Sequence, residues 1–379
     1  MAKKVLIVAS VVSMIKSYNQ ENIKLLQKMG YDVDVACNFK ATNFGGTEGF
    51  DKILQNRGVT TYQIDFARSP YDLYHMFIAT KQLAKIIKHG HYHFVHCHSP
   101  IGGLIARLLC RFYNTKTIYT AHGFHFYDGA PIQNWLFYYT VEYLLSFITD
   151  SLITMNKEDY ERAKNHFHAR HIWQIPGIGL DIKEFADTET DREAKRREIN
   201  VPSDAILIIT ASELIKRKNV DTAIKAIAKI DNPKLHYVVA GKGPLSDSLN
   251  QLIKSLGAES RIQLLGFRTD IAQLCKSSDI FLLPSFQEGL SVAVMEAMAS
   301  GLPCITSRIR GSTDLIGDLC DECTFKPLDQ EKLISIINNM INNPEMIKHV
   351  VEYNKKRVLN FSVENSMKAT ETIYRVYDN

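Results

Sequence analysis

Two glutamates, Glu288 and Glu296, stand eight positions apart around a predicted strand, turn and helix. The apolar run 279–283 predicts a buried strand, Gly289 marks a turn, and residues 290–299 suit a helix. Eight residues of helix rise about 12 Å, roughly the separation of the two sugars of a nucleotide-sugar across its diphosphate. The helix start between the carboxylates favours phosphate. The spacing indicates either hydroxyl-binding carboxylates around a diphosphate or two solvated glutamates, and both interpretations stay open.

A basic cluster, Lys216, Arg217 and Lys218, follows a predicted strand over 205–211. Ligands of parallel α/β sheets bind at the carboxyl ends of strands, so this cluster suits a diphosphate. Runs of basic residues are more often a solvated face. Position and composition therefore leave two interpretations, a phosphate site and an ordinary surface.

Two further strand ends carry residues suited to a nucleotide. Gly241 and Gly243 form a Gly-x-Gly loop, but Ser246 stands where a dinucleotide fingerprint has its third glycine. Close approach of the backbone to a nucleotide remains open. At the next strand end, backbone groups at Phe267 and Arg268 are candidates to recognise a base.

The first half of the chain has its own candidate site. His122 follows a predicted strand over 117–120, where it either faces a ligand or is one of many loop histidines. His125, Tyr127 and Asp128 come next and are candidates for an acceptor site.

The loop after the first predicted strand, residues 9–12, contains no glycine, so a dinucleotide fingerprint is absent there. Lys16, a few positions further on, is predicted to contact the acceptor.

Other motifs favour no metal site. The histidines between positions 89 and 98 alternate along a strand, which separates His96 and His98 from Cys97, and no acidic ligand accompanies them. The single pair Cys320-x-x-Cys323 is too little for structural zinc. No Ser-His-Asp pattern and no P-loop are visible.

The aromatic stretch 135–147 has more apolar residues than one helical face needs. Core packing explains most of them, and contact with a membrane interface is the alternative. Glu142 and the length of the stretch argue against a membrane span.

Strands alternate with helices along the chain, which predicts parallel, doubly wound α/β sheets. In the first half, strands are expected over 5–8, 32–36, 62–65, 94–96, 117–120 and 151–155, with helices over 17–29, 71–88 and 103–112. In the second, strands are expected over 205–211, 236–240, 262–265, 279–283 and 304–306, with helices over 219–230 and 246–256.

The stretch Pro176-Gly-Ile-Gly179 interrupts this alternation and predicts a hinge. We expect domains at 1–178 and 179–361, facing each other across a cleft, with a final helix over 362–379 that packs back onto the first.

Composition is that of a globular protein of 379 residues, with 45% hydrophobic and 23% charged residues. Seven irregularly placed cysteines favour a reducing cytoplasm. Residues 1–179 carry 19 Lys and Arg against 13 Asp and Glu, giving +6, whereas the remainder carries 26 against 28. A basic first half favours an anionic partner, a membrane surface or phosphorylated acceptor rather than nucleic acid.

Taken together, several strings resemble retaining glycosyltransferases of family 4, which have the GT-B fold of two Rossmann-like domains. The resemblance is carried by Glu288-Gly with Glu296, and by the strings at 119–127, 175–181, 213–219 and 309–316, and it covers nearly the whole chain. Bacterial capsular and exopolysaccharide transferases are the most similar subgroup.

This resemblance implies a role for each matching residue. Lys218, with Arg217, would contact the donor diphosphate, Glu288 the donor sugar, and Glu296 the ribose. His122 would lie near the reacting carbon.

Gly289, Leu290 and Ser291 match the loop whose amides touch the sugar and phosphate. Glu213 stands where many members have an arginine, so Lys218 must neutralise the diphosphate with Arg217 or Lys216.

The expected activity is metal-independent transfer from a UDP-sugar to a polyprenyl-diphosphate-linked saccharide, at the cytoplasmic face of a bacterial membrane. No cofactor and no nucleic-acid partner are expected. The alternatives are a sugar-nucleotide epimerase of the same fold and a non-catalytic nucleotide-sugar-binding partner in an assembly.

Overall fold

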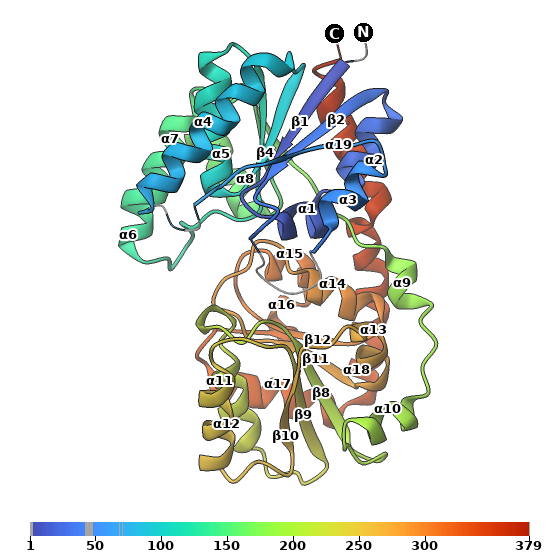
Figure 1. The fold of residues 1–379 in the computed structure, drawn as a ribbon. Coiled ribbons are helices and arrows are strands. Elements are labelled where there is room, and N and C mark those ends of the chain that lie inside the picture. Colours follow the sequence, from blue (N-terminus) through green and yellow to red (C-terminus); the bar gives the residue numbers. More distant parts are fainter. Residues whose placement is uncertain (1–2, 42–47, 68, 70, 379) are drawn as a thin grey trace. The chain divides into compact units, whose positions relative to one another are not determined.

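The computed structural model describes residues 3–41, 48–67, 69 and 71–378, and these form two units. Unit 1 comprises residues up to Gly179 together with the segment from Val363, and unit 2 comprises Leu180–Ser362. The expected boundary after residue 178 lies one residue before this division. Residues 1–2 and 379 of the expected first domain lie outside the described part. Figure 1 shows the helices and strands of both units.

Within its described residues, unit 1 is built on a seven-stranded parallel sheet with the order β3-β2-β1-β4-β5-β6-β7. The strands are β1 Lys3–Val8, β2 Tyr31–Cys37, β3 Thr60–Gln63, β4 Phe94–His98, β5 Lys116–Ala121, β6 Ser151–Thr154 and β7 His171–Gln174. Its helices are α1 Val12–Tyr18, α2 Gln20–Lys28, α3 Phe50–Gln55, α4 Leu73–Gly90, α5 Pro100–Phe112, α6 Ile132–Asn134, the π-helix η1 Trp135–Tyr139, α7 Thr140–Ser146, α8 Lys157–His166 and α19 Val363–Arg375.

Helices cover both faces of this sheet (Figure 1). The helices α4, α5 and α7 lie on one face, whereas α2 and α19 lie on the other. The final helix is anchored through Tyr374, whose hydroxyl lies 2.8 Å from Nδ1 of His96 and whose ring stacks on Phe94. This long-range packing assigns α19 to unit 1.

Unit 2 has a six-stranded parallel sheet with the order β10-β9-β8-β11-β12-β13 in the described residues. Its strands are β8 Ile206–Ala211, β9 Leu235–Ala240, β10 Ile262–Gly266, β11 Ile280–Leu283, β12 Cys304–Ser307 and β13 Thr324–Phe325. Its helices are α9 Ile182–Ala186, α10 Arg192–Glu198, η2 Lys216–Lys218, α11 Val220–Ala228, α12 Ser246–Ser255, α13 Ile271–Ser277, α14 Val292–Ala299, α15 Ser312–Ile316, η3 Gly317–Leu319, α16 Cys320–Cys323, α17 Gln330–Asn342, α18 Pro344–Val358 and η4 Leu359–Phe361.

The predicted parallel, doubly wound α/β class is confirmed in both units. In unit 2, α11 packs with α12 and α17, and α13 packs with α10 and α14 (Figure 1). Because the strands are parallel, the loops after β8 to β12 all leave the same edge of the sheet. This edge collects the candidate residues of unit 2.

One local prediction was wrong, and two strands were not predicted. The single helix expected over 17–29 is two helices, because the buried Asn19 between them leaves helical geometry and donates its side-chain amide to the Met14 carbonyl. The strands β7 and β13 were missed. Both are sheet edges, and neither is an apolar run of the length that marks a buried strand.

Candidate functional site

The carboxylate of Glu288 lies in the loop between β11 and α14 and contacts two basic side chains from η2. The Lys218 Nζ atom is 2.6 Å from one carboxylate oxygen, and the Arg217 Nη1 atom is 3.4 Å from the other. Arg217 also donates to the Gln287 carbonyl, and Arg310 donates from Nε to the Glu288 carbonyl. We call Arg217, Lys218, Glu288 and Arg310 the charged cluster.

Backbone contacts hold the two loops of this cluster together. The Phe286 N–H donates to the Arg217 carbonyl at 2.9 Å. The buried Asn219 donates its amide to the carbonyls of Pro284 and Pro327, and its left-handed backbone ends η2. The sequence predicted Lys218 at a diphosphate and Glu288 at a sugar. The structure brings the two side chains into direct contact, 70 residues apart in the chain.

The helix α14 begins beside Glu288. Ser291 is its N-cap and accepts a hydrogen bond from the Val294 N–H. The N–H groups of Val292 and Ala293, in the first turn, have no acceptor within the helix. At the other end, the Gly301 and Leu302 N–H groups bond back to the helix in the Schellman pattern.

The estimate of about 12 Å between the two glutamates assumed helix across all eight positions, which the structure does not have. Helical geometry begins only at Val292, and Glu288 lies in the loop. Glu296 lies within α14, where burial and the nearby charge of Glu184 raise its pKa to about 7. Near neutral pH this carboxyl group is therefore partly protonated and can both donate and accept hydrogen bonds.

Gly289 and Leu290 lie in the turn between Glu288 and α14, and Gly311 packs against this turn. A Cβ atom on Gly311 would lie 2.0 Å from the Gly289 carbonyl oxygen, and its φ of 73° also favours glycine. Together with Arg310, Gly311 supports the turn from the loop after β12. No site role was predicted for these two residues, although an Arg-Gly pair in the loop after a predicted strand was visible.

Gly241 and Gly243 are explained by packing inside the unit. Cβ atoms at these positions would lie 1.8 Å from the Ser212 carbonyl oxygen and 2.4 Å from that of Leu214. The backbone that packs against these glycines is the loop after β8, and the predicted approach to a nucleotide stays a prediction.

Phe267 is exposed, and the Lys242 ammonium lies 5.1 Å from the centre of its ring. The Arg268 guanidinium binds the carboxylates of Asp270 and Glu198, and these partners raise its pKa. The predicted contact between the backbone at Arg268 and a base stays a prediction.

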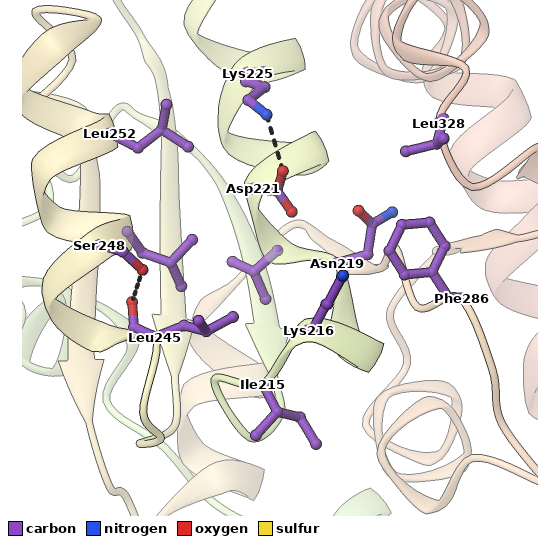
Figure 2. Close-up of a pocket in the computed structure, with 12 residues that line it drawn as sticks. Ile215, Lys216, Asn219, Asp221, Lys225, Leu245, Ser248, Leu252, Phe286 and Leu328 are labelled. Carbon is purple, nitrogen blue, oxygen red and sulfur yellow. Dashed lines mark hydrogen bonds and ion pairs between the residues drawn. The ribbon is translucent and has the colours of Figure 1, made fainter.

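A pocket of about 410 Å³ lies within unit 2 (Figure 2). It is lined by Ile215, Lys216, Asn219, Val220, Asp221, Lys225, Leu245, Ser248, Leu249, Leu252, Phe286 and Leu328. Figure 2 shows residues of α12 on one side and Asn219, Phe286 and Leu328 on the other. Lys216 and Phe286 each stand two positions from Lys218 and Glu288, so the pocket and the cluster share two segments.

In unit 1, His122 follows β5 and lies against other aromatic side chains. Its Nε2 atom is 3.1 Å from Nδ1 of His98, and its ring lies 5.2 Å from that of Tyr18. Burial lowers the pKa of His122 to about 4, so its imidazole is neutral near pH 7. Within the described residues, no group of three or more His, Cys, Asp or Glu side chains is arranged to hold a metal ion.

A second pocket, of about 350 Å³, lies within unit 1. It is lined by Ser10, Val11, Ala67, Met76, Ser99, Pro100, Ile101, Leu104, His125, Phe137, Tyr138, Val141 and Glu142. Apolar residues dominate its walls, and Ser10, Ser99 and His125 come from the carboxyl ends of strands β1, β4 and β5.

Of the predicted acceptor residues, one lines this pocket and the others do not. His125 lines it, and its ring stacks on Tyr138 with centroids 4.6 Å apart. Tyr127 and the exposed Lys16 are not among the described residues that line it. Asp128 is exposed and pairs with Arg162 at 2.7 Å.

No helix in the part of the chain that the structure describes is both long and apolar enough to cross a bilayer.

Two doubly wound parallel units, with polar and charged residues gathered where their strands end, define the GT-B class of α/β fold. The family models of group 1 glycosyl transferases and of glycosyl transferase 4-like proteins match residues 191–357 and 4–156. A putative glycosyltransferase of Bacillus subtilis, EpsD, is 33% identical over all of this chain and 97% of its own length. The chain therefore belongs to the group 1, family 4-like glycosyltransferases.

Two further comparisons concern function and fold. A galactosyltransferase of Escherichia coli, whose name gives UDP-Gal and α-D-GlcNAc-diphosphoundecaprenol as its substrates, is 29% identical over 67% of this chain and 68% of its own length. The crystal structure of HepE from Anabaena, with UDP and glucose, superposes with a TM-score of 0.79 at 17% identity, covering 98% of this chain and all of that one. The expected GT-B fold is confirmed by this likeness.

Proposed function

We propose that this glycosyltransferase moves a sugar from a UDP-hexose or UDP-N-acetylhexosamine to a saccharide on a polyprenyl diphosphate, with retention and without a metal. The product would enter capsule or exopolysaccharide synthesis at the inner face of the membrane. The contact between Lys218 and Glu288 beside the start of α14 is the observation that carries the proposal. The names of the E. coli relative and of the Anabaena complex support this choice of donor and acceptor.

The bond that breaks joins the anomeric carbon to the diphosphate, and UDP leaves with the electron pair. In the proposal, Lys218 and the first-turn amides of α14 stabilise the developing negative charge. Glu288 binds hydroxyls of the donor sugar, and Glu296 binds those of the ribose. The acceptor oxygen bonds to the anomeric carbon from the side the phosphate leaves, and its proton passes to a phosphate oxygen. This scheme needs no nucleophile from the protein.

On the acceptor side, we assign the pocket beside His125 to the lipid-linked saccharide. Its mixed lining, with hydroxyls and an imidazole at strand ends and apolar residues elsewhere, suits a ligand with a polar head and an apolar carrier. His122, held neutral by burial, serves as a hydrogen-bonding group near the reacting carbon and not as a cation.

The test is a screen of nucleotide-sugars for release of UDP or GDP, with and without a polyprenyl-diphosphate saccharide. The proposal expects slow UDP release that the acceptor accelerates. Conversion of a UDP-sugar to an isomeric UDP-sugar would indicate an epimerase. Binding of a UDP-sugar without any turnover would indicate a non-catalytic partner.

Substitutions locate the activity. Glu288→Ala is expected to abolish turnover, and Lys218→Ala is expected to weaken UDP binding by about tenfold or more, the loss of a charge-assisted hydrogen bond. Glu193→Ala and Lys229→Ala remove exposed charges elsewhere in unit 2 and serve as matched controls. Unchanged product with Glu288→Ala would refute the catalytic assignment.

A further inference from the structure

Exposed apolar side chains concentrate on one group of helices in unit 1. Of the eighteen large hydrophobic residues exposed in the described chain, eleven lie between positions 71 and 147. They are Tyr71, Leu73, Tyr74, Phe77, Leu108, Phe112, Ile132, Leu136, Phe137, Leu144 and Phe147, and each is between 49% and 87% exposed. Such a concentration of apolar surface marks an interaction site.

The helices that carry these residues are contiguous. The helix α4 packs on α5, α5 packs on α7, and η1 contacts both α6 and α7 (Figure 1). In the stretch 135–147, Trp135 and Tyr139 pack against the core, whereas Leu136 and Leu144 are exposed. Core packing therefore explains only part of this aromatic stretch. We call the exposed residues of α4, α5, α6, η1 and α7 the α4–α7 face.

The exposed charged side chains of this face are all basic. Its exposed charged residues are Lys81, Lys85, Lys88 and Arg111. Glu142 is the only acidic residue in the sequences of these five helices. It is buried and paired with Arg107 through two hydrogen bonds, of 2.8 and 3.1 Å.

The acidic residue that caps α4 is already partnered. Asp72 caps α4 and lies 2.7 Å from Nδ1 of His75, next to the exposed Leu73. The face therefore presents cations and apolar side chains together.

Along α4, exposed apolar side chains come first and basic side chains follow. Leu73, Phe77, Lys81 and Lys85 follow one another at four-residue spacing, so they form one stripe that is apolar first and basic afterwards. The Lys81 ammonium lies 4.2 Å from the centre of the Phe77 ring. Long lysine side chains of this kind reach from an apolar surface toward charged headgroups.

A second copy of the chain suits this face poorly. A two-fold interface would place the same patch against itself, which would bury Lys81, Lys85 and Lys88 against a face that exposes no acidic side chain to pair with them. An anionic bilayer instead offers negative headgroups to the lysines and an acyl boundary to the apolar side chains.

We propose that the α4–α7 face docks this glycosyltransferase on an anionic bilayer. Phe137 belongs both to this face and to the lining of the pocket beside His125. The docked orientation thus brings that pocket to the membrane, where a lipid-linked acceptor would be found. Only this last step rests on the proposed function, because docking itself depends on the face alone.

The experiment is co-sedimentation of the full chain with two kinds of vesicle. One kind is phosphatidylcholine alone, and in the other about a third of the lipid is phosphatidylglycerol, comparable to an anionic leaflet. We expect binding to the anionic vesicles, at least tenfold weaker binding to neutral ones, and weakening with added salt. Equal binding to both vesicles, or to neither, would overturn the proposal.

Two variants separate the charges from the apolar contacts. The triple variant Lys81→Gln, Lys85→Gln, Lys88→Gln is expected to lower the partition coefficient by up to about 100-fold, about fivefold for each lysine. The variant Leu136→Ser, Leu144→Ser is expected to lower it by about tenfold or more, because two apolar anchors no longer enter the interface. Both variants should still release UDP from the donor without acceptor, which keeps a docking failure distinct from failure of the enzyme.

A matched control carries Leu256→Ser and Leu359→Ser, which remove exposed leucines from unit 2. It should bind the anionic vesicles like the parent. Unchanged binding by the lysine and leucine variants of the face would refute the assignment. So would sedimentation equilibrium that shows a stable dimer dispersed by Leu136→Ser, Leu144→Ser.

Discussion

The pair formed by Lys218 and Glu288 predicts a measurable coupling in stability. Their side chains are only 13% and 8% exposed, and the atoms that meet are 2.6 Å apart. Removing one partner of a buried ion pair costs about 3–5 kcal/mol, because the other charge stays buried. Arg217 remains 3.4 Å from Glu288 but is 40% exposed, so it replaces Lys218 only in part. We therefore expect Lys218→Met to cost about 2 kcal/mol and Glu288→Gln about 3 kcal/mol.

The double variant should cost less than the sum of the two, because it leaves neither charge alone in the protein. A coupling free energy of about 2 kcal/mol is expected from the cycle. Hydrogen exchange in peptides from β8 and β11, measured across a urea series, reports the free energy of unfolding of unit 2.

The exposed pair Lys234 and Asp204, with atoms 2.8 Å apart, provides the control cycle. Its side chains are hydrated, so Lys234→Met and Asp204→Asn should show little coupling. A coupling below about 0.5 kcal/mol for Lys218 and Glu288 would refute the reasoning that the pair is desolvated.

Three further predictions concern other positions. The pKa of Glu296 in the folded protein is raised to about 7, so the stability contributed by its protonated form is present at pH 4 and is lost as the pH rises through 7. In urea titrations, the free energy of unfolding of Glu296→Gln should therefore rise relative to that of the parent by up to about 3 kcal/mol between pH 4 and pH 8. A difference that does not depend on pH would contradict this. Gly311→Ala should displace the Gly289 turn and weaken UDP binding in calorimetry, whereas Gly257→Ala, at a similar φ but with open space, should leave UDP binding unchanged. Proton NMR should find the His122 ring neutral at pH 6, and titration near its ordinary value of 6.5 would contradict the burial that lowers its pKa.

The fold followed from local sequence patterns where the patterns were strong. Apolar runs such as the one ending at Leu283 predicted the central strands to within one or two residues. The edge strands β7 and β13 were not predicted, because His171–Gln174 and Thr324–Phe325 have little apolar patterning, whereas the edge strands β3 and β10 were. The break between α1 and α2 at Asn19 was also not predicted, because it depends on a buried side chain that donates a hydrogen bond to the preceding turn.

The sequence indicated residues of the candidate site but did not predict which of them contact each other. Strand ends placed Lys218 and Glu288 on one edge of the sheet, but spacing along the chain does not specify that two residues 70 positions apart will touch. Gly241 and Gly243 indicated that some backbone approaches them closely. Which segment it is depends on the tertiary structure, and the sequence pattern does not specify it. Arg310 and Gly311 were not predicted as site residues for the same reason. Their role is to support the turn at Glu288 and Gly289, which is a tertiary contact.

The helix α19 has a consequence for the order in which the protein is made. Its Tyr374 completes the packing of unit 1 against Phe94 and His96, but it is synthesised after the whole of unit 2. Because α19 follows unit 2 in the chain, unit 1 cannot cover the sheet face that carries Phe94 until unit 2 has been synthesised. Unit 1, although most of it is encoded first, receives α19 only after unit 2 has been made, and nascent chains should expose that apolar face to chaperones until then.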